Sequence, residues 1–472
     1  MQRTKMIFTI GPASDNEEIL RKFIQIGMSV ARLNFSHGTH ETHKQKIDLI
    51  KKIRKELNSP TAIMLDIKGP KIRTHNFIND GVELIDGQAF TFICDDEILG
   101  DNEKCSISYA ALYKDVSIGG SILVDDGLLK FRIDEIKGTH IICTVIVGGV
   151  IKNHKGVNVP NVDINLPSIT DKDKEDLIFG CKMGVDFVAA SFVRKASDIV
   201  EVRNILNEHG GEHIQIIGKI ESQEGVNNID EILKQADGIM VARGDMGVEI
   251  PIERVPIIQK NIIRKCNEAG KIVITATQML DSMIRNSLPT RAEACDICNA
   301  IFDGTDAIML SGESASGAFP IEAATTMATI AQETEKHIDY VYLNQRLREP
   351  AMGDFAEAIS YSACRTSNVL NAKAIVAATT SGSTAKLISK YRPKCPIIAI
   401  TPNEYVLRRL NLTFGIIPLL CQQFETTDEI IAESKKVAKK LSCANDGDNI
   451  LIAAGFPTTH TGGTNMLKIE KI

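Results

Sequence analysis

The chain contains eight short apolar runs, and each ends in a cluster of polar residues. The runs are Met6–Ile10, Val30–Asn34, Ala62–Asp66, Val185–Ala190, Ile214–Lys219, Gly238–Ala242, Ile272–Ala276 and Ala307–Leu310. Most are followed by a segment with helical periodicity, such as Pro251–Ala269. Near-continuous apolar strands are typical of a parallel sheet that is covered on both faces. Eight strand–helix units predict a (β/α)8 TIM barrel of the α/β class, with its catalytic groups at the carboxyl ends of the strands.

Two regions depart from this alternation of strand and helix. From about Gly69 to Pro167 the pattern changes to short strands separated by Asp-Gly and Gly-Gly turns, which predicts an inserted all-β domain. It leaves the barrel on the catalytic side, where a lid would lie. From Asp354 onward helices and strands alternate again. The expected division is a barrel from residues 1–69 and 168–345, a β-barrel lid from 70–167, and a C-terminal α/β domain from 346–472.

The composition of the chain excludes several classes of protein. With 472 residues, 43% hydrophobic and 24% charged, the chain is expected to be soluble, globular and built of more than one domain. The net charge of −6 is spread along the chain without a basic stripe, so we expect no nucleic-acid partner. No apolar run is long enough for a membrane span or a secretory signal. Eleven scattered cysteines fit a reducing cytoplasm.

Two acidic residues follow neighbouring predicted strands. Glu221 and Asp245 would both lie at the catalytic end of the barrel. Two carboxylates suit Mg²⁺ or Mn²⁺, whose remaining ligands would be water and substrate oxygens. The alternative is that each acid simply pairs with a neighbouring lysine or arginine, and the residues alone leave both interpretations open.

Further polar residues at the strand ends favour a phosphate site. Lys219 precedes Glu221 by two positions and could neutralise a phosphoryl group during its transfer. Arg32 suits a forked contact with phosphate. The oxygens of three neighbouring residues could surround a monovalent cation: Asn34, Ser36 and Asp66. The backbone amides of Gly244 and Asp245 could receive a small anionic acid, with Thr277 beside them.

Eight segments, in order along the chain, closely resemble motifs of the pyruvate kinase family. They are Thr9–Ser14, Ala31–Gly38, Lys68–Pro70, Lys219–Ser222, Arg243–Gly247, Ala276–Leu280, Pro289–Glu293 and Asp303–Glu313. The resemblance extends over essentially the full chain. It implies transfer of the phosphoryl group of phosphoenolpyruvate to ADP, which gives pyruvate and ATP in the last step of glycolysis.

The resemblance also implies roles for individual residues. Catalysis would involve Arg32, Lys219, Thr277 and Ser311, and substrate binding Arg32, Lys219, Gly244, Asp245 and Thr277. Glu221 and Asp245 would hold Mg²⁺, and Thr277 and Ser311 would relay a proton, through water, to the enolate carbon. Asn34, Arg73 and Asp126 match family positions near the nucleotide.

The resemblance further implies a monovalent cation site. At that site the sequence departs from the usual residues of the family. K⁺ would be held by Asn34, Ser36, Asp66 and the carbonyl of Ile67. Here Ile67 replaces a usual threonine, and Lys71 replaces a usual glutamate. The Lys71 ammonium could supply the missing positive charge, so the chain resembles the K⁺-independent branch. A lysine left in solvent at the lid hinge is the alternative.

The C-terminal domain resembles the effector domain of the family. The segment Thr379-Thr380-Ser381-Gly382-Ser383-Thr384 follows a predicted strand and opens a helix, so its hydroxyls and amides could bind a phosphorylated metabolite. An ordinary helix cap is the alternative. The loop lacks the basic residue that is often found in it, so the sequence does not identify the effector. The family usually forms homotetramers, which we carry over as an expectation.

Two competing functions keep the predicted barrel. An enolpyruvate or aldol-type barrel enzyme would also bind Mg²⁺ through two acids, but it would not explain the lid, Lys219 or the third domain. A non-catalytic, metabolite-sensing paralogue should have lost Lys219, Glu221, Asp245 or Thr277, and all four are present.

Overall fold

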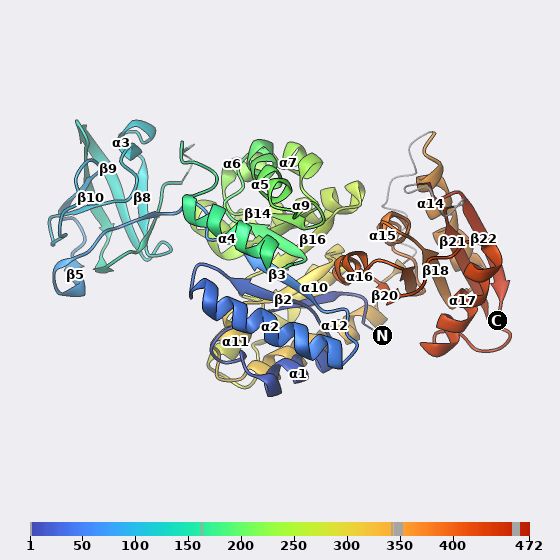
Figure 1. Cartoon of the computed structure of the whole chain (residues 1–472). Coiled ribbons are helices and arrows are strands. Elements are labelled where there is room, and N and C mark those ends of the chain that lie inside the picture. Colours follow the sequence, from blue (N-terminus) through green and yellow to red (C-terminus); the bar gives the residue numbers. More distant parts are fainter. Residues whose placement is uncertain (1, 161, 163, 341–342, 344–352, 456–462) are drawn as a thin grey trace.

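The computed structural model describes residues 2–160, 162, 164–340, 343, 353–455 and 463–472. Three bodies follow one another in space, with the β insertion at one end, the barrel in the middle and the C-terminal domain at the other end (Figure 1). Among the described helices, none is both long and apolar enough to cross a membrane.

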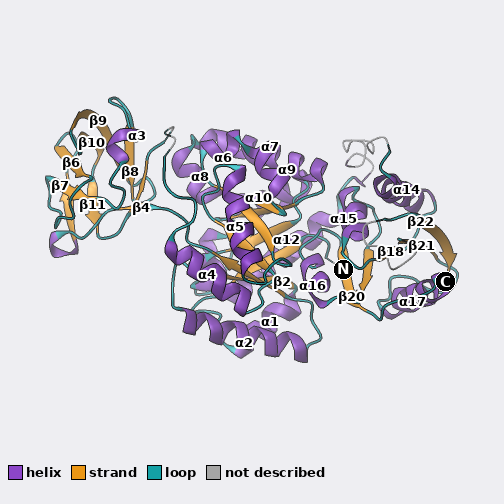
Figure 2. Ribbon diagram, turned by 45° about the horizontal axis from the view of Figure 1, so that its top comes forward, coloured by secondary structure: helices purple, strands orange, loops and turns teal. Residues whose placement is uncertain are grey.

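Eight parallel strands form a closed barrel in the order β1-β17-β16-β15-β14-β13-β3-β2. The strands are β1 Lys5–Thr9, β2 Met28–Asn34, β3 Ala62–Asp66, β13 Phe187–Ala190, β14 Gln215–Ile220, β15 Gly238–Ala242, β16 Ile272–Ala276 and β17 Ala307–Leu310. Helices surround these strands on the outside (Figure 2). The predicted (β/α)8 architecture is confirmed.

The strands are almost wholly apolar because each has two buried faces. All six residues of β14 are buried. Ile216 and Ile220 pack outward against the surrounding helices, whereas Ile217 lies in the core inside the barrel. This alternation follows from the two-residue period of a strand.

Eleven α-helices belong to the described part of the barrel. They are α1 Glu17–Ile26, α2 His40–Glu56, α4 Asp171–Lys182, α5 Ala196–Glu208, α6 Gln223–Asn227, α7 Ile229–Gln235, α8 Arg243–Glu249, α9 Val255–Ala269, α10 Arg291–Asp303, α11 Gly312–Ala315 and α12 Pro320–Lys336. Five of them, α1, α2, α4, α6 and α10, begin with a side-chain cap. Three short 3-10 helices lie at Ile78–Asp80, Ile252–Arg254 and Asp281–Ile284. At the start of α10, Thr290 and Glu293 form a capping box.

The insertion is built of β-strands around its own apolar core. Its larger sheet has seven strands in the order β4-β12-β8-β9-β10-β6-β7, and β11 pairs with β5 in a second sheet. The strands are β4 Ile72–Arg73, β5 Gly81–Leu84, β6 Ala89–Ile93, β7 Lys104–Ser106, β8 Ser121–Val124, β9 Leu129–Lys137, β10 His140–Val147, β11 Gly149–Lys152 and β12 Gly156–Asn158, with a short helix, α3, at Leu112–Asp115. Next to the two edge strands of the larger sheet, Ser108 N donates to Arg73 O (2.9 Å) and His75 N to Ser106 O (3.0 Å), so the sheet curls round on itself.

The C-terminal domain is a five-stranded sheet in the order β20-β19-β18-β21-β22, with only β22 antiparallel. Its strands are β18 Ala374–Ala378, β19 Ile397–Thr401, β20 Ile416–Leu420, β21 Asn449–Ala454 and β22 Met466–Lys471. Its helices are α14 Phe355–Val369, α15 Ser383–Lys390, α16 Glu404–Leu410 and α17 Thr427–Lys440. The predicted boundary at residues 345 and 346 lies outside the described residues.

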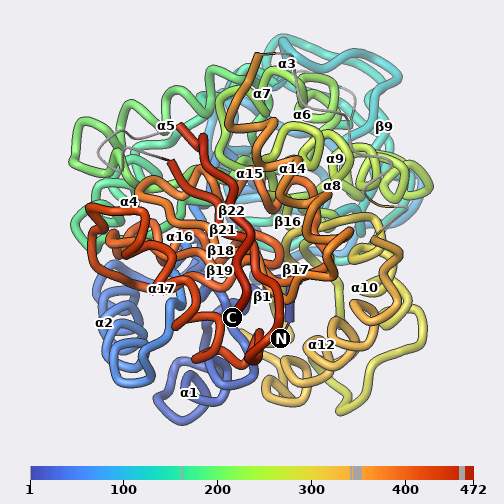
Figure 3. Tube along the Cα trace, turned by 90° about the vertical axis from the view of Figure 1, so that its right-hand side faces the viewer, coloured from blue at the N-terminus to red at the C-terminus, as the bar shows by residue number. Residues whose placement is uncertain are grey.

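This domain covers the amino ends of the barrel strands (Figure 3). Gly415 N donates to Arg3 O at 3.0 Å, and Lys5 Nζ donates to Ile416 O at 2.6 Å. Leu412 is fully buried and belongs to the apolar core inside the barrel. The carboxyl ends of the strands therefore face away from the C-terminal domain and toward the inserted one.

Candidate functional site

The polar residues predicted at the strand ends come together in the structure. Asp66 ends β3 and pairs in register with Asn34, the last residue of β2. Lys219 lies on β14, and Glu221 follows that strand directly. Asp245 lies in the first turn of α8, which begins where β15 ends. The parallel register of adjacent strands fixes all these positions at one end of the barrel.

Two buried cations share the Asp66 carboxylate. Arg32 Nε donates to Asp66 Oδ2 at 2.6 Å, and Lys219 Nζ lies 3.3 Å from Asp66 Oδ1. Lys219 Nζ also donates to Ser191 Oγ at 2.7 Å and lies 3.1 Å from Glu221 Oε1. Lys219 and Arg32 are buried, so their charged ends are held by protein groups and not by solvent.

These pairings set the charge states of the cluster. Burial opposes ionisation of Lys219, but the Asp66 and Glu221 carboxylates outweigh it and raise the lysine pKa. Burial likewise opposes ionisation of Asp66, yet Arg32 and Lys219 hold its pKa below the usual value. Glu221 differs, because burial together with the nearby Asp245 charge raises its pKa despite Lys219. The positive charge near Glu221 is therefore too small to offset the effects of burial and of Asp245 on its ionisation.

The Glu221 and Asp245 carboxylates fit a divalent cation. Glu221 Oε2 accepts the backbone N–H of Phe192 at 2.5 Å, whereas the buried Oε1 accepts no hydrogen bond of good geometry. The Lys219 ammonium, 3.1 Å away, is the one charged partner that this oxygen has among the described residues, so a second cation could share it. In the described part of the chain no cluster of three or more His, Cys, Asp or Glu side chains is arranged to hold a metal. Two protein carboxylates are thus what this site offers, which suits a small ion that keeps water and substrate ligands.

Lys71 joins the insertion to the barrel at this site. Its ammonium lies 3.0 Å from Asp245 Oδ1 and 3.3 Å from Asp126 Oδ1. Asp245 belongs to the barrel, whereas Asp126 belongs to the turn between β8 and β9. Burial opposes the charge of Lys71, but these two acids outweigh it and raise its pKa. The ammonium pairs with these two acids, and no contact joins it to the proposed cation-site residues Asn34, Ser36 and Asp66.

Thr277 and Gly244 lie side by side at the ends of β16 and β15. Gly244 N donates to Thr277 Oγ1 at 2.8 Å, and the Thr277 hydroxyl donates to Ala276 O at 2.6 Å. Thr277 has a φ of 68°, which is uncommon for a β-branched residue. Arg243 supports this backbone by donating to the carbonyl of Thr277 at 2.6 Å and pairing with Asp296. A threonine kept in such a conformation has its hydroxyl aimed by the surrounding structure.

Ser311 lies at the end of β17, where Glu313 fixes the loop. Glu313 Oε2 accepts Ser311 N at 2.7 Å, and Glu313 Oε1 accepts Leu280 N at 3.1 Å. The buried Glu313 carboxylate thus ties the loops after β16 and β17 together. This holds the segments that carry Thr277 and Ser311 in fixed relation.

The groups predicted to surround a monovalent cation are already engaged with one another. Asn34 Oδ1 accepts Ser36 N at 3.1 Å, and Ile67 O accepts the Ser191 hydroxyl at 2.7 Å. Asp66 is occupied by Arg32 and Lys219. Arg73, predicted near a nucleotide, donates from Nη1 to His154 O at 2.8 Å within the insertion.

Several residues of the cluster were given no role by the sequence analysis. Ser191 directly follows β13 and links Lys219 to Asp66 and Ile67; its strand-end position was a usable signal. Asp296 lies within α10 and Glu313 follows β17, and no local pattern reveals that they support the neighbouring strand-end loops. Glu249 at the end of α8 accepts a hydrogen bond from Asn158 of the insertion at 3.2 Å. Burial raises the pKa of Glu249 to about 7.

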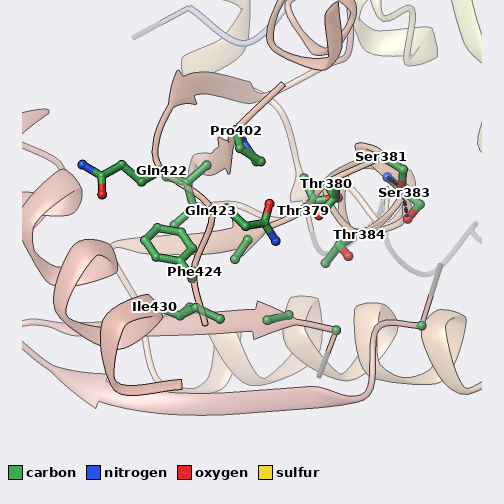
Figure 4. Close-up of a pocket in the computed structure, with 15 residues that line it drawn as sticks. Thr379, Thr380, Ser381, Ser383, Thr384, Pro402, Gln422, Gln423, Phe424 and Ile430 are labelled. Atoms are coloured by element: carbon green, nitrogen blue, oxygen red, sulfur yellow. Dashed lines mark hydrogen bonds between the residues drawn. The ribbon is translucent and has the colours of Figure 1, made fainter. Parts of the chain in front are cut away.

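The predicted effector segment forms one wall of a small hollow in the C-terminal domain. Its residues follow β18 and lead into α15, with Gly382 at φ +91° just before the helix. Thr379 Oγ1 accepts Gly382 N at 2.9 Å, and the hydroxyls of Ser381 and Ser383 lie 3.0 Å apart. The side chain of Gln423 extends toward Thr379 and Thr380 from the opposite wall (Figure 4). The hollow has a volume of about 50 Å³.

Known proteins match the chain over its whole length. The family model "Pyruvate kinase, barrel domain" matches residues 1–324, and "Pyruvate kinase, alpha/beta domain" matches residues 357–470. A pyruvate kinase of Clostridium perfringens is 70% identical over 474 residues and covers 100% of both chains. One from Geobacillus stearothermophilus is 51% identical, covering 100% of this chain and 80% of the relative. The crystal structure of a pyruvate kinase from Cryptosporidium parvum superimposes with a TM-score of 0.95 at 41% identity, covering 100% of this chain and 96% of that one.

Proposed function

The chain belongs to the pyruvate kinase family, and we propose that the cluster around Lys219 carries out the family's reaction. That reaction transfers the phosphoryl group of phosphoenolpyruvate to ADP and yields pyruvate and ATP in glycolysis. Of the two alternative functions considered, an aldol-type enzyme and a non-catalytic paralogue, neither is supported by these comparisons.

In this proposal Lys219 and Arg32 stabilise the phosphoryl group while it passes from phosphoenolpyruvate to ADP. The observation that carries it is the buried Lys219 ammonium, held within 3.1 Å of Glu221 and 3.3 Å of Asp66. A charge that is fixed before the reaction stabilises the transferring group without reorganisation at the moment of transfer. Arg32 is oriented by Asp66 and by Thr9, whose hydroxyl oxygen lies 2.9 Å from Nη1. Ser191 keeps the Lys219 ammonium in place.

Glu221 and Asp245 would hold the divalent cation on which this family generally depends. The buried Oε1 of Glu221, which accepts no well-aligned hydrogen bond and has only the Lys219 ammonium 3.1 Å away, supports this assignment. When bound, Mg²⁺ or Mn²⁺ supplies positive charge that neutralises the anionic substrate. The chain's own contribution is to bury one carboxylate and hold the other nearby, so that burial and then the charge of Asp245 raise the pKa of Glu221.

The amides of Gly244 and Asp245 and the Thr277 hydroxyl would receive the carboxylate of phosphoenolpyruvate. In the structure Gly244 N donates to Thr277 Oγ1 and the Thr277 hydroxyl donates to Ala276 O, so both groups would exchange these bonds for bonds to the substrate carboxylate. Thr277 and Ser311 would relay a proton through water to the carbon that becomes the methyl group of pyruvate. The support for this relay is the Glu313 carboxylate, which fixes both loops.

Lys71 is proposed to reduce or remove the K⁺ requirement. Asn34, Ser36, Asp66 and Ile67 would form the K⁺ site if one is used, and Lys71 brings a permanent positive charge to the same end of the barrel. Asn34, Arg73 and Asp126 are proposed to bind the nucleotide. Asp126 reaches the barrel through Lys71, which supports a lid that closes over this site.

Three further proposals concern regulation, assembly and location. A phosphorylated metabolite would bind the segment from Thr379 to Thr384, supported by its hydroxyls and by the hollow that it lines. The family's homotetramer is carried over as a proposal. The eleven free cysteines are consistent with work in the reducing cytoplasm.

Steady-state kinetics with phosphoenolpyruvate and ADP, monitoring both pyruvate and ATP, test the proposed function. Equal yields of the two products are expected, with a requirement for Mg²⁺ and with activity in the absence of K⁺. Pyruvate formation without ATP would favour an aldol-type or hydrolytic activity, and no turnover at all would favour the non-catalytic alternative.

A further inference from the structure

A second polar cavity lies between the barrel and the C-terminal domain, at the end of the barrel opposite the active site. It has a volume of about 180 Å³, roughly ten times the space that a single water molecule needs. From the barrel side it is lined by Asp237, Asn267, Gly270, Lys271, Ile272 and Asp306. From the C-terminal domain it is lined by Lys386, Ser389, Lys390, Arg392 and Thr413. We call it the base cavity.

Three polar side chains of the C-terminal domain that line the base cavity have groups without a hydrogen-bond partner. Lys386 Nζ forms no hydrogen bond or ion pair with any residue that the structure describes, and burial lowers its pKa to about 8. Thr413 is only 6% exposed, and its hydroxyl has no hydrogen-bond partner. Arg392 is 3% exposed, and its Nε–H is likewise unsatisfied. Lys386 is half-buried, whereas the Thr413 and Arg392 groups are fully buried. Buried polar groups usually have partners, so two buried unsatisfied groups beside an unpaired ammonium around one cavity indicate an acceptor that fills it.

The two acids that line the cavity meet this demand only in part: the Asp237 charge partly offsets the effect of burial on the pKa of Lys386, but the contacts of both acids are with other groups. Asp237 pairs with Arg203 at 2.8 Å and accepts Ile216 N at 2.9 Å. Asp306 accepts Val273 N at 2.9 Å and pairs with Arg392 Nη1, also at 2.9 Å. Neither carboxylate forms an ion pair with Lys386.

The cavity also has an excess of positive charge. Its charged lining consists of four cations, Lys271, Lys386, Lys390 and Arg392, and two anions, Asp237 and Asp306. Lys390 is paired with Glu357, and Lys271 donates to Ala236 O at 2.8 Å, which leaves further N–H groups of Lys271 available. A small anion is the ligand that matches this charge and these donors.

We propose that the base cavity binds a small tetrahedral oxyanion of the phosphate or sulfate type. Lys386, Thr413 and Arg392 donate to it from the C-terminal domain, and Lys271 does so from the barrel. The site is separate from both the catalytic cluster and the effector segment. It lies at the far end of the eight-residue helix α15, whose first residues belong to the effector segment, so the anion joins that helix to the barrel base.

Crystallography with an anomalous scatterer tests the site directly. Crystals of the full chain soaked in sodium selenate are expected to show an anomalous peak within about 3 Å of Lys386 Nζ and Thr413 Oγ1. The peak should be lost in Lys386→Met and kept in the matched control Lys436→Met, which removes an exposed lysine of the same domain. A base cavity that contains only water, while selenate binds elsewhere on the same molecule, would overturn the proposal.

Thermal unfolding gives an independent solution test at constant ionic strength. Without phosphate, Lys386→Met should be as stable as the wild type or more stable, because the variant removes an unpaired, half-buried ammonium from a cavity with excess positive charge. Inorganic phosphate should raise the midpoint of the wild type and of Lys436→Met more than that of Lys386→Met. Thr413→Val should show an intermediate loss. Phosphate binding at other sites is common to all variants and cancels in the comparison.

Two results of the solution test would contradict the proposal. One is an equal phosphate-dependent rise in the wild type and in Lys386→Met. The other is a rise that depends on Lys386 with a hexose monophosphate but not with inorganic phosphate, since this would assign the cavity to a larger ligand. Turnover under saturating substrate should be unchanged in Lys386→Met, so failure of this proposal can be distinguished from failure of the catalytic assignment.

Discussion

Replacing Lys219 by methionine removes the ammonium that we propose stabilises the phosphoryl group during transfer, while it keeps most of the apolar stem of the side chain. The ammonium is held by Ser191 at 2.7 Å, Glu221 at 3.1 Å and Asp66 at 3.3 Å, so it is positioned before the substrate arrives. A unit charge about 4 Å from a transferring oxygen, at an effective dielectric constant of about 20, contributes about 4 kcal/mol. We therefore expect kcat to fall by about 10³-fold.

The assay couples pyruvate formation to NADH oxidation by lactate dehydrogenase. The KM for phosphoenolpyruvate should change by no more than about threefold, because Arg32 and the Gly244 amide still bind the substrate. Binding of Mn²⁺, followed by electron paramagnetic resonance, should stay the same or become tighter, since Glu221 loses a competing cation. Asp66 keeps Arg32 as a partner, so the variant should fold, which circular dichroism can check.

Ser191→Ala serves as the matched control. It keeps the ammonium and removes one of its hydrogen bonds, so a loss of only about three- to tenfold in kcat is expected. If Lys219→Met lost less than tenfold in kcat with Mn²⁺ binding intact, the electrostatic role given to Lys219 would be wrong. An equal loss in both variants would instead mean that position, and not charge, limits the rate.

Four other changes test separate parts of the structure. Lys71→Glu should make turnover depend on K⁺ at least tenfold more strongly than in the wild type, measured in buffers free of K⁺; unchanged dependence would contradict the role of Lys71. Because burial raises the pKa of Glu249 to about 7, folding favours its protonated form, and stability falls as pH rises from about 4.5 through 7. Glu249→Gln should therefore gain stability over the wild type above pH 7, by at most about 3 kcal/mol, and none below pH 4.5; a pH-independent difference in urea unfolding would refute this. Gly382→Ala should strain the effector loop, because residue 382 has a φ of +91°. It should therefore weaken the binding of a phosphorylated activator, so that the activator no longer shifts the phosphoenolpyruvate saturation curve, while activity without activator stays the same. Thr277→Ala should lower kcat by about 10²-fold or more with little effect on Mn²⁺ binding.

The barrel could be predicted from the sequence because its strands are buried on both faces. Gly238–Ala242 has no polar position, Ile272–Ala276 has only the β-branched Thr275, and the strands coincide with both runs residue for residue. The run that begins at Val185 is less regular, because the strand begins only at Phe187. Asp186 lies just before that strand. Its carboxylate accepts Ile63 N and pairs with Arg408 of the C-terminal domain. Such long-range partners leave no local pattern.

The cluster of charged residues at the strand ends was predictable for a related physical reason. In a parallel barrel every strand ends on the same side, so Asp66, Lys219 and Glu221 had to lie near one another once the strands were assigned. Arg243 shows the limit of this rule. It also follows a strand, yet its guanidinium supports the Thr277 backbone and pairs with Asp296 instead of entering the charged cluster. The direction of a strand-end side chain depends on helix residues that the strand pattern does not reveal.

The Lys71 ammonium would connect the proposed metal site to the inserted domain. In the structure it lies between Asp245 of the barrel and Asp126 of the insertion, and these two acids raise its pKa against the effect of burial. Under the proposed assignment, a divalent cation held by Glu221 and Asp245 would compete electrostatically with Lys71 for the Asp245 carboxylate, which Lys71 contacts at Oδ1. The other partner of Lys71 is Asp126, whose side chain is 70% exposed. In that proposal the lysine would do more than change a local charge, because the contact between the insertion and the barrel would depend on whether the two carboxylates hold a cation.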